Sequence, residues 1–391
     1  MTGPLQGVKI IDLSRVLAGP YCTMILGDMG ADVIKIESVD SGDETRGWGP
    51  PFVEGESAYY LCANRNKRGI TLNIKTKQGQ EILKKLISDA DVVVQNFKPG
   101  TLDKLGLGFE EMNKVNEGII LASISGFGST SALPGYDYII QAMSGLMSIT
   151  GEKEAQPTKV GVAIADVLTG LYTCIGILGA LLHRNKTGEG QDIDISLFDS
   201  QLAGLVNVAS NYLCSGQIPE RLGNAHPNIV PYQVFSASDG DFIIAVGNDQ
   251  QYRKFAMLLK DESLLSKHYE KNSSRLKNKD GLLKIIAAKI KTRPKAEWKQ
   301  LLDEAGIPNG PINNVKEALE SDEAATREMV VQVNHPVITD LKLVGSPLKF
   351  SRTPVKIKRH PPMHSEHTEE VLKKLGYSNM EIKKMKQDGI F

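Results

Sequence analysis

Asp166 is the residue of this chain whose type and surroundings point most directly to chemistry. Between residues 160 and 182 it is the only side chain expected to be charged at neutral pH, in a run dominated by Val, Ile, Leu, Ala and Gly. Moving a carboxylate from water into such surroundings is costly unless the protein supplies hydrogen bonds. An ionised carboxylate kept there can act as a nucleophile.

Helix capping is the structural explanation for the same residue. Asp is favoured at the N-cap, so Asp166 would precede a helix over residues 167–184 and accept hydrogen bonds from its first-turn N–H groups. The helix dipole would also keep the carboxylate ionised. Capping and nucleophilic chemistry are therefore compatible, and both interpretations stay open.

Most other motifs that carry chemistry are absent. No G-x-G-x-x-G follows the first expected strand, and there is no P-loop, H-E-x-x-H or G-x-S-x-G. The seven histidines are scattered and the four cysteines are widely spaced, so we expect no metal site and reduced thiols. His226, in a loop rich in Asn, Gly and Pro, is retained as a candidate pocket residue.

The first two hundred residues alternate between strand and helix patterns. Strands are expected at residues 8–13, 32–37, 68–74, 91–96, 118–124 and 191–197, with helices at 19–29 and 77–89 and one ending at 214. Strands separated by helices are typical of a parallel, doubly wound α/β sheet.

The pattern changes near residue 216. A linker at 216–233 precedes a smaller α+β domain at 234–325, with a hairpin at 234–246 and helices at 251–259, 280–290 and 295–304. Strand-like pieces at 330–333 and 341–343 and two short helices after residue 365 follow. The pattern therefore places the smaller domain between residues 1–215 and residues 326–391.

The bulk composition excludes several classes of protein. Lys plus Arg and Asp plus Glu each number 46, so the net charge of zero argues against a nucleic-acid partner or a polybasic membrane anchor. The first residues do not read as a signal peptide, and residues 167–182 are too short for a confident membrane span. We expect a cytoplasmic protein.

Eight segments, in order along almost the whole chain, resemble the family III CoA-transferases, the group of formyl-CoA transferase, carnitine CoA-transferase and alpha-methylacyl-CoA racemase. The first segment spans residues 4–20 and ends in the motif Asp-Leu-Ser-Arg-Val-Leu-Ala-Gly-Pro at 12–20. Two others are Gly-Ala-Asp-Val-Ile-Lys-Ile-Glu at 30–37 and Asn-Phe-Lys-Pro-Gly at 96–100. The others lie at 66–73, 126–128, 136–142, around Asp166 and at 186–191.

The resemblance implies an interlocked homodimer with a smaller domain and a Rossmann-like large domain. It implies that the large domain is built from both chain ends, residues 1–215 and 326–391. It matches Asp166 to the family's catalytic aspartate. It implies a substrate pocket with Leu17, Tyr136, Asp137 and His226. The positions that it matches to CoA contacts are Leu72, Lys75, Asn96, Phe97, Lys98 and Lys104.

The chemistry that the resemblance implies uses an acyl-CoA, with succinyl-CoA as a candidate, and a carboxylic acid. Asp166 would form a mixed anhydride and then a thioester with CoA, which is a substrate, and no metal or further cofactor is expected. Attacking carboxylates and thiolates are already anions, so the site needs donors for oxyanions rather than a general base.

Two branches of the family fit less well. The racemases carry Gly-His-Asp where this chain has Gly-Tyr-Asp at 135–137, and tyrosine is a poor base near neutral pH. Formyl-CoA transferases carry glutamine at the position of Leu17 and a glycine run at residues 224–232. Transfer is therefore the favoured activity, with a racemase or a non-catalytic acyl-CoA-binding protein as alternatives.

Overall fold

The computed structural model describes residues 3–391 and divides into two compact units. The large unit contains the chain up to Leu146, together with Lys159–Gln217 and Asp322–Phe391. The second unit contains Met147–Thr158 and Ile218–Ser321. Residues 147–158 thus lie outside the large unit, to which the sequence prediction assigned them.

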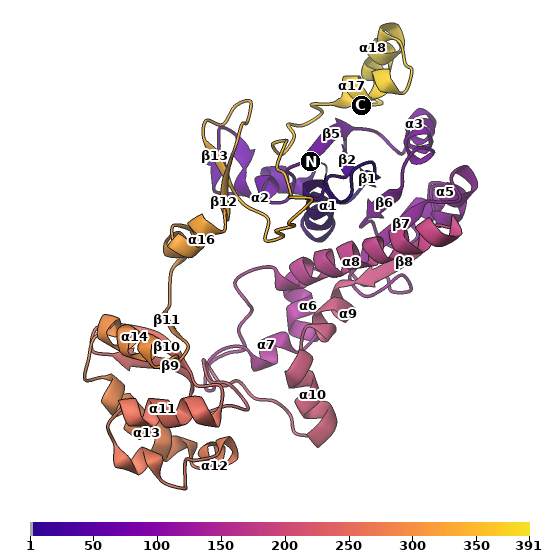
Figure 1. Ribbon diagram of the computed structural model, residues 1–391. Helices are drawn as coiled ribbons and strands as arrows, with labels where there is room; N and C mark the ends of the chain where they lie inside the picture. Colours follow the sequence, from indigo (N-terminus) through magenta and orange to yellow (C-terminus); the bar gives the residue numbers. More distant parts are fainter. Residues whose placement is uncertain (1–2) are drawn as a thin grey trace. The chain divides into compact units, whose positions relative to one another are not determined.

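A six-stranded parallel sheet forms the centre of the large unit, in the order β5-β2-β1-β6-β7-β8 (Figure 1). The strands are β1 (Lys9–Asp12), β2 (Asp32–Glu37), β5 (Lys67–Thr71), β6 (Val92–Gln95), β7 (Ile120–Ser125) and β8 (Gln191–Ser196). Chain order reverses between β1 and β6, as in doubly wound folds. The predicted α/β sheet is confirmed.

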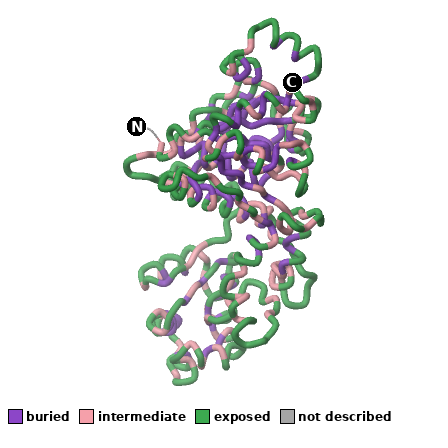
Figure 2. The backbone as a smooth tube through the Cα atoms, turned by 90° about the vertical axis from the view of Figure 1, so that its right-hand side faces the viewer, coloured by how far each residue is buried: buried purple, intermediate pink, exposed green. Residues whose placement is uncertain are grey.

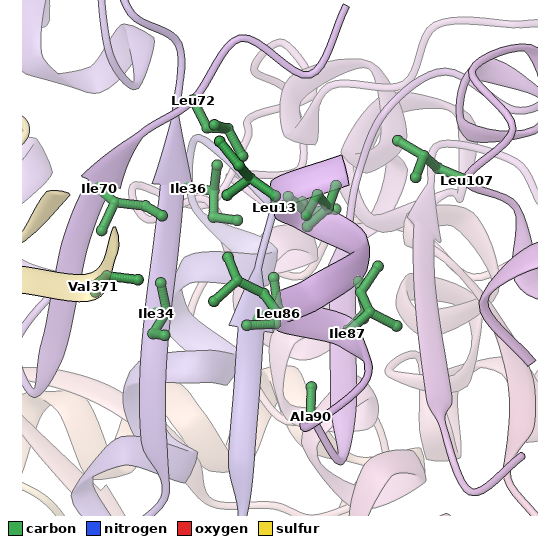
Figure 3. Close-up of a cluster of buried hydrophobic side chains, with 14 of the residues drawn as sticks. Leu13, Ile34, Ile36, Ile70, Leu72, Leu86, Ile87, Ala90, Leu107 and Val371 are labelled. Carbon is green, nitrogen blue, oxygen red and sulfur yellow. The ribbon is translucent and has the colours of Figure 1, made fainter. Parts of the chain in front are cut away.

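Helices cover both faces of this sheet. One face packs against α3 (Lys77–Ile87), α5 (Phe109–Val115), α17 (Thr368–Lys374) and α18 (Asn379–Gln387). In Figure 3, Leu13, Ile34 and Ile70 of this face meet Leu86 and Val371. The opposite face packs against α1 (Ala18–Asp28), α6 (Asp137–Met143) and α8 (Ile164–Thr187). Burial on both faces explains the apolar run Val-Val-Val of the central strand β6.

The last segment of the chain closes the sheet at β5. The Asn73 N–H donates to Ile390 O at 2.8 Å, and the His367 N–H donates to Gly69 O at 2.9 Å. Figure 2 shows the buried backbone concentrated inside the unit that carries both chain ends. The C-terminal segment thereby covers the sheet edge that β5 would otherwise expose.

The second unit has its own sheet and core. The predicted hairpin is present as β9 (Tyr232–Ala237) and β10 (Gly240–Ala245), and β11 (Asn309–Pro311) joins it antiparallel. The helices α11 (Asp249–Leu258), α13 (Lys279–Ile290) and α14 (Lys295–Glu304) surround a core that contains Phe242, Phe255 and Trp298. Its three predicted helices are confirmed within two residues at each end.

The predicted helix after β8 is two helices, α9 (Leu197–Ala203) and α10 (Val206–Ser215). The short helices of the large unit include a 3-10 helix at Glu44–Gly47, α2 (Ala58–Leu61), α4 (Thr101–Lys104) and α16 (Asp322–Thr326). Its short strands are β3 (Phe52–Val53), β4 (Glu56–Ser57), β12 (Val330–Val333) and β13 (Leu341–Val344). The β12–β13 pair confirms both strand-like pieces expected near the C-terminus.

The helix α8 is long and apolar enough to cross a membrane by length and composition alone. Its buried residues include Thr169, Thr173, Ile177 and Ala180, and this stripe packs against α1, β7 and β8. A side chain at Gly170 would lie 2.7 Å from Ala18 O, so glycine is required where α8 crosses the start of α1. The beginnings of α1 and α8 are thereby held together.

Candidate active site

A cleft of about 210 Å³ lies beyond the carboxyl ends of β1 and β6, and it contains Asp166. These neighbouring strands are the pair between which the chain order reverses, where doubly wound folds bind their ligands. The lining consists mainly of residues 15–18 after β1, 96–99 after β6, 132–136 before α6, the first α6 residue Asp137, and Asp166. All of them belong to the large unit.

Asp166 is the third residue of α8, not its N-cap. The helix begins at Ile164, three residues before the predicted start, and Ala163 occupies the N-cap position without a side-chain cap. Among residues 3–391, none forms a hydrogen bond with the Asp166 carboxylate at the geometry of an ordinary bond. The capping interpretation of Asp166 is therefore wrong.

Asp137 supplies the cap that the sequence suggested for Asp166. Its Oδ1 accepts a hydrogen bond from the Ala165 N–H at 2.9 Å, and its Oδ2 accepts one from Gln141 Nε2 at 2.8 Å. Ala165 is the second residue of α8, where an N–H lacks a partner within the helix. A carboxylate from α6 thus satisfies the start of α8 and leaves Asp166 free.

The electrostatics of Asp166 are those of a partly desolvated carboxylate. Burial, and then the nearby charge of Asp137, raise the pKa of Asp166 to about 7. Desolvation and a like charge therefore outweigh the helix dipole, which was expected to keep the group ionised. A carboxylate with this raised pKa is more basic than an exposed one and still ionises near neutral pH. Such a shift is characteristic of catalytic groups.

The loop after β1 carries backbone strain beside the cleft. Val16 has φ of 70°, in the left-handed region that β-branched residues avoid. Its N–H donates to Asp43 Oδ1 at 3.2 Å. On the preceding residue, the Arg15 N–H donates to Asn96 Oδ1 at 3.0 Å and Asn96 Nδ2 donates to Arg15 O at 2.7 Å. Two side chains thus fix the conformation that presents Leu17 to the cleft.

Buried ion pairs stabilise the start of this loop. Lys35 Nζ donates to Ser14 O at 2.8 Å and lies 2.9 Å from Asp43 Oδ2, and both side chains are fully buried. Lys67 Nζ lies 3.0 Å from Asp12 Oδ2 at the end of β1. Burial alone would raise the pKa of Asp12, but Lys67 and then Lys35 lower it to about 2. Lys35, Asp43, Lys67 and Asp12 therefore each have a partner of opposite charge, and these pairs fix the position of the residues from which the loop begins.

A second cavity of about 500 Å³ adjoins the cleft, since Arg15, Glu44 and Phe97 line both. Leu72 and Lys75 line this larger cavity, whereas Asn96 and Lys98 line the Asp166 cleft. Lys104 ends α4 and lines neither cavity. Five of the six predicted CoA contacts are thus gathered around adjoining cavities, and their binding of CoA stays a prediction.

The remaining predicted residues divide between the two units. Leu17, Tyr136 and Asp137 line the Asp166 cleft. His226 belongs to the second unit, where its Nδ1 accepts from the Asn228 N–H at 3.0 Å. Its place in the pocket stays a prediction. Within residues 3–391, no three His, Cys, Asp or Glu side chains gather as metal ligands would.

Sequence reasoning missed two residues near the nucleophile. The ring centroid of Tyr59, in α2, lies 5.1 Å from that of Trp48. Burial, and then the charge of Asp166, raise the pKa of Tyr59 to about 12. It is therefore a neutral phenol. Arg15 lines both cavities and pairs with Glu44. Arg15 stands within the quoted motif at 12–20, and its charge beside an apolar loop was the available signal.

Comparisons with known proteins identify the family of this chain. The model of the CoA-transferase family III matches residues 5–368. The mouse succinyl-CoA:glutarate CoA-transferase is 42% identical over 99% of this chain and 90% of its own length. The succinate–glutarate CoA-transferase of Agrobacterium fabrum is 43% identical over 95% of this chain and 96% of its own length.

A solved structure supports the same assignment. The crystal structure of a CAIB/BAIF family protein from Brucella suis superposes with a TM-score of 0.85 at 42% identity, covering 96% of this chain and all of that one. A family match over nearly the whole chain and relatives above 40% identity lead to the same conclusion. The chain belongs to the family III CoA-transferases and is a CoA-transferase.

Proposed function

We propose that this enzyme moves CoA from succinyl-CoA to a dicarboxylic acid of the glutarate class through covalent intermediates on Asp166. The observation that carries the proposal is the Asp166 carboxylate, which faces a cleft at the sheet's switch point, has a raised pKa and has no hydrogen-bond partner among residues 3–391. The named substrates of the relatives, which are succinyl-CoA with glutarate or mesaconate, support the choice of donor and acceptor class.

The first half of the reaction loads CoA onto the enzyme. An Asp166 oxygen attacks the succinyl thioester carbon and expels CoA thiolate, which leaves a mixed anhydride. The thiolate then attacks the aspartyl carbonyl and expels succinate, so that the enzyme carries CoA as an aspartyl thioester. Both nucleophiles attack as anions, so neither step requires a general base.

The second half unloads CoA onto the acceptor. A carboxylate oxygen of the acceptor attacks the aspartyl thioester carbon and expels the thiolate, which forms a second anhydride. The thiolate attacks the acceptor's carbonyl in that anhydride, gives the new acyl-CoA and releases the Asp166 carboxylate. Anhydrides hydrolyse, and the apolar start of α8 and Leu17 limit the access of water to Asp166.

Preference for a second carboxylate on the acceptor rests on the cations of the cleft, Arg15 and Lys98. The Arg15 side chain is 49% exposed and its partner Glu44 41% exposed, so solvent weakens their ion pair. A substrate carboxylate can therefore compete with Glu44 for a bidentate contact with the Arg15 guanidinium. A monocarboxylate of the same length offers no such group.

The alternative racemase activity has less support from the cleft. None of the residues that line it is a histidine, and Tyr136 occupies the position where the racemases carry one. Both oxygens of Asp137 already accept hydrogen bonds, so this carboxylate is poorly placed to take an α-proton. A purely CoA-binding protein would not need an unpartnered carboxylate at the cleft.

We also propose a homodimer. On α8, Tyr172, Ile175 and Leu182 are 44%, 62% and 63% exposed, and on α10 Val206 and Leu213 are 67% and 79% exposed. Two helices of the large unit thus leave large apolar side chains in solvent. Exposed apolar surface of this extent is characteristic of a protein–protein interface.

The test of the function is intact-mass analysis of the protein after incubation with succinyl-CoA and no acceptor. We expect a covalent CoA adduct on the wild-type chain that is lost when glutarate is added, with glutaryl-CoA appearing in solution. Asp166→Asn should form no adduct, since an amide is not a nucleophile here. Glutaryl-CoA formation by Asp166→Asn at the wild-type rate would refute the proposal.

A further inference from the structure

Asp137 and Gln141 of α6 hold the segment that leads into the nucleophile. Gln141 is fully buried; its Oε1 accepts from the Val160 N–H at 2.8 Å, and its Nε2 donates to Asp137 Oδ2 and, at 3.4 Å, to Val162 O. Asp137 Oδ1 in turn accepts from the Ala165 N–H. Three bonds from one turn of α6 thus fix residues 160–165.

We propose that Asp137 is a positioning residue for Asp166, because it caps α8 from outside the helix and leaves both oxygens of the nucleophile free for the acyl group. The inference rests on the proposed function of Asp166. A carboxylate in the first turn of a helix commonly bonds backbone N–H groups of that turn. Here the Ala165 N–H, one of the groups without an intrahelical partner, is already occupied by Asp137.

The cap also sets the charge environment of the nucleophile. Asp137, from α6, is the charged group that raises the pKa of Asp166 beyond the effect of burial. Tyr59, from α2, faces the same carboxylate as a neutral phenol. Removal of the Asp137 charge should therefore lower the pKa of Asp166. Removal of the Asp137 Oδ1 atom should in addition leave the Ala165 N–H, at the start of α8, without its acceptor. The two effects are separable by two substitutions.

Asp137→Asn keeps an oxygen for the Ala165 N–H and removes the charge, at the loss of the bond from Gln141 Nε2, which an amide nitrogen does not accept. Asp137→Ala removes both the oxygen and the charge. Ser378→Ala is the matched control, since Ser378 caps α18 by accepting from the Glu381 N–H, far from the cleft in sequence and outside its lining. The readouts are kcat and KM for succinyl-CoA between pH 5 and 9, with glutarate as the acceptor.

For Asp137→Asn we expect the acid limb of kcat/KM to move to lower pH by about one unit, with kcat at pH 8 within about threefold of wild type. For Asp137→Ala we expect the same shift and a loss of kcat of about 10- to 100-fold with KM little changed, because a misplaced nucleophile reacts slowly. Ser378→Ala should change neither quantity.

An unshifted acid limb in Asp137→Asn, or wild-type kcat in Asp137→Ala, would overturn the inference. Complete loss of transfer in Asp137→Asn would also overturn it, because Asp137 would then take part in the chemistry itself. A wild-type protein without CoA transfer would instead refute the proposed function. A loss of kcat in Ser378→Ala equal to that in Asp137→Ala would reduce the effect to general destabilisation and overturn the positioning role.

Discussion

Substitution of the nucleophile should stabilise the protein, and the gain should depend on pH. The pKa of Asp166 rises from 3.8 to about 7 in the folded chain. Between these values the unfolded chain releases the proton and the folded chain retains it, so rising pH destabilises the wild type. Asp166→Asn has no carboxylic proton to lose there, so the variant should avoid this penalty.

The size of the gain follows from the shift. One pKa unit corresponds to about 1.4 kcal/mol, so the full shift corresponds to about 4 kcal/mol above pH 7, and solvent at the partly exposed carboxylate reduces this to about 2 to 4 kcal/mol. At pH 5 only the part of the pKa shift between 3.8 and 5 contributes to the gain in stability. With the same reduction for solvent, this part corresponds to about 1 kcal/mol. Loss of activity with a gain in stability is the trade-off expected at a functional site.

Tryptophan fluorescence during urea unfolding measures this gain. The chain has two tryptophans, Trp48 in the large unit and Trp298 in the second unit. In a Trp298→Phe background, the signal therefore follows the unit that contains Asp166. Asp322→Asn, which changes an exposed carboxylate of the same unit, is the control. An equal midpoint for wild type and Asp166→Asn at pH 8, or a gain as large at pH 5 as at pH 8, would refute the reasoning.

Four further outcomes are expected. In wild type, kcat/KM should fall below about pH 7 as Asp166 becomes protonated, and a flat profile down to pH 5 would contradict the raised pKa. Arg15→Gln should lower kcat/KM for glutarate about 100-fold and leave pentanoate unchanged, a loss typical of a charged hydrogen-bonded pair; equal losses for both acids would argue against Arg15 as the dicarboxylate contact. EDTA should leave transfer unchanged, since carboxylate and thiolate attack without a Lewis acid, whereas inactivation reversed by a divalent ion would contradict this. Sedimentation should show a dimer at micromolar concentration, and a stable monomer would exclude it.

The sequence predicted the parts of the fold that follow from short-range patterns. The strand over residues 32–37 was predicted to the residue as β2, and the second-unit helices agree within two residues. Alternation of apolar strands and helices is a local property, and it determines the doubly wound sheet. The pairing of β5 with the C-terminal segment was implied only by the family resemblance, since 317 residues separate Asn73 from Ile390.

The site shows where local reasoning fails. Asp166 resembles an N-cap in sequence because it precedes a long apolar run, yet the cap comes from Asp137, 28 residues before Ala165. The helix α6 that carries Asp137 was not predicted, because its seven residues show too little periodicity. The buried side chains of Lys35 and Lys67 read as surface residues in isolation. Asp12, the partner of Lys67, becomes visible only when β1, β2 and β5 are adjacent. Asp43, the partner of Lys35, lies in the segment that follows β2 and becomes visible only when that segment folds back.

The dependence of the large unit on the C-terminal segment also has a consequence for biosynthesis. Val371, Ile382 and Phe391 lie in the same core cluster as strands made at the start of translation. The ribosome therefore completes the second unit, at residue 321, before the large unit can close. Until then the early sheet exposes apolar surface and the outer edge of β5, a state that favours chaperone binding or aggregation during synthesis.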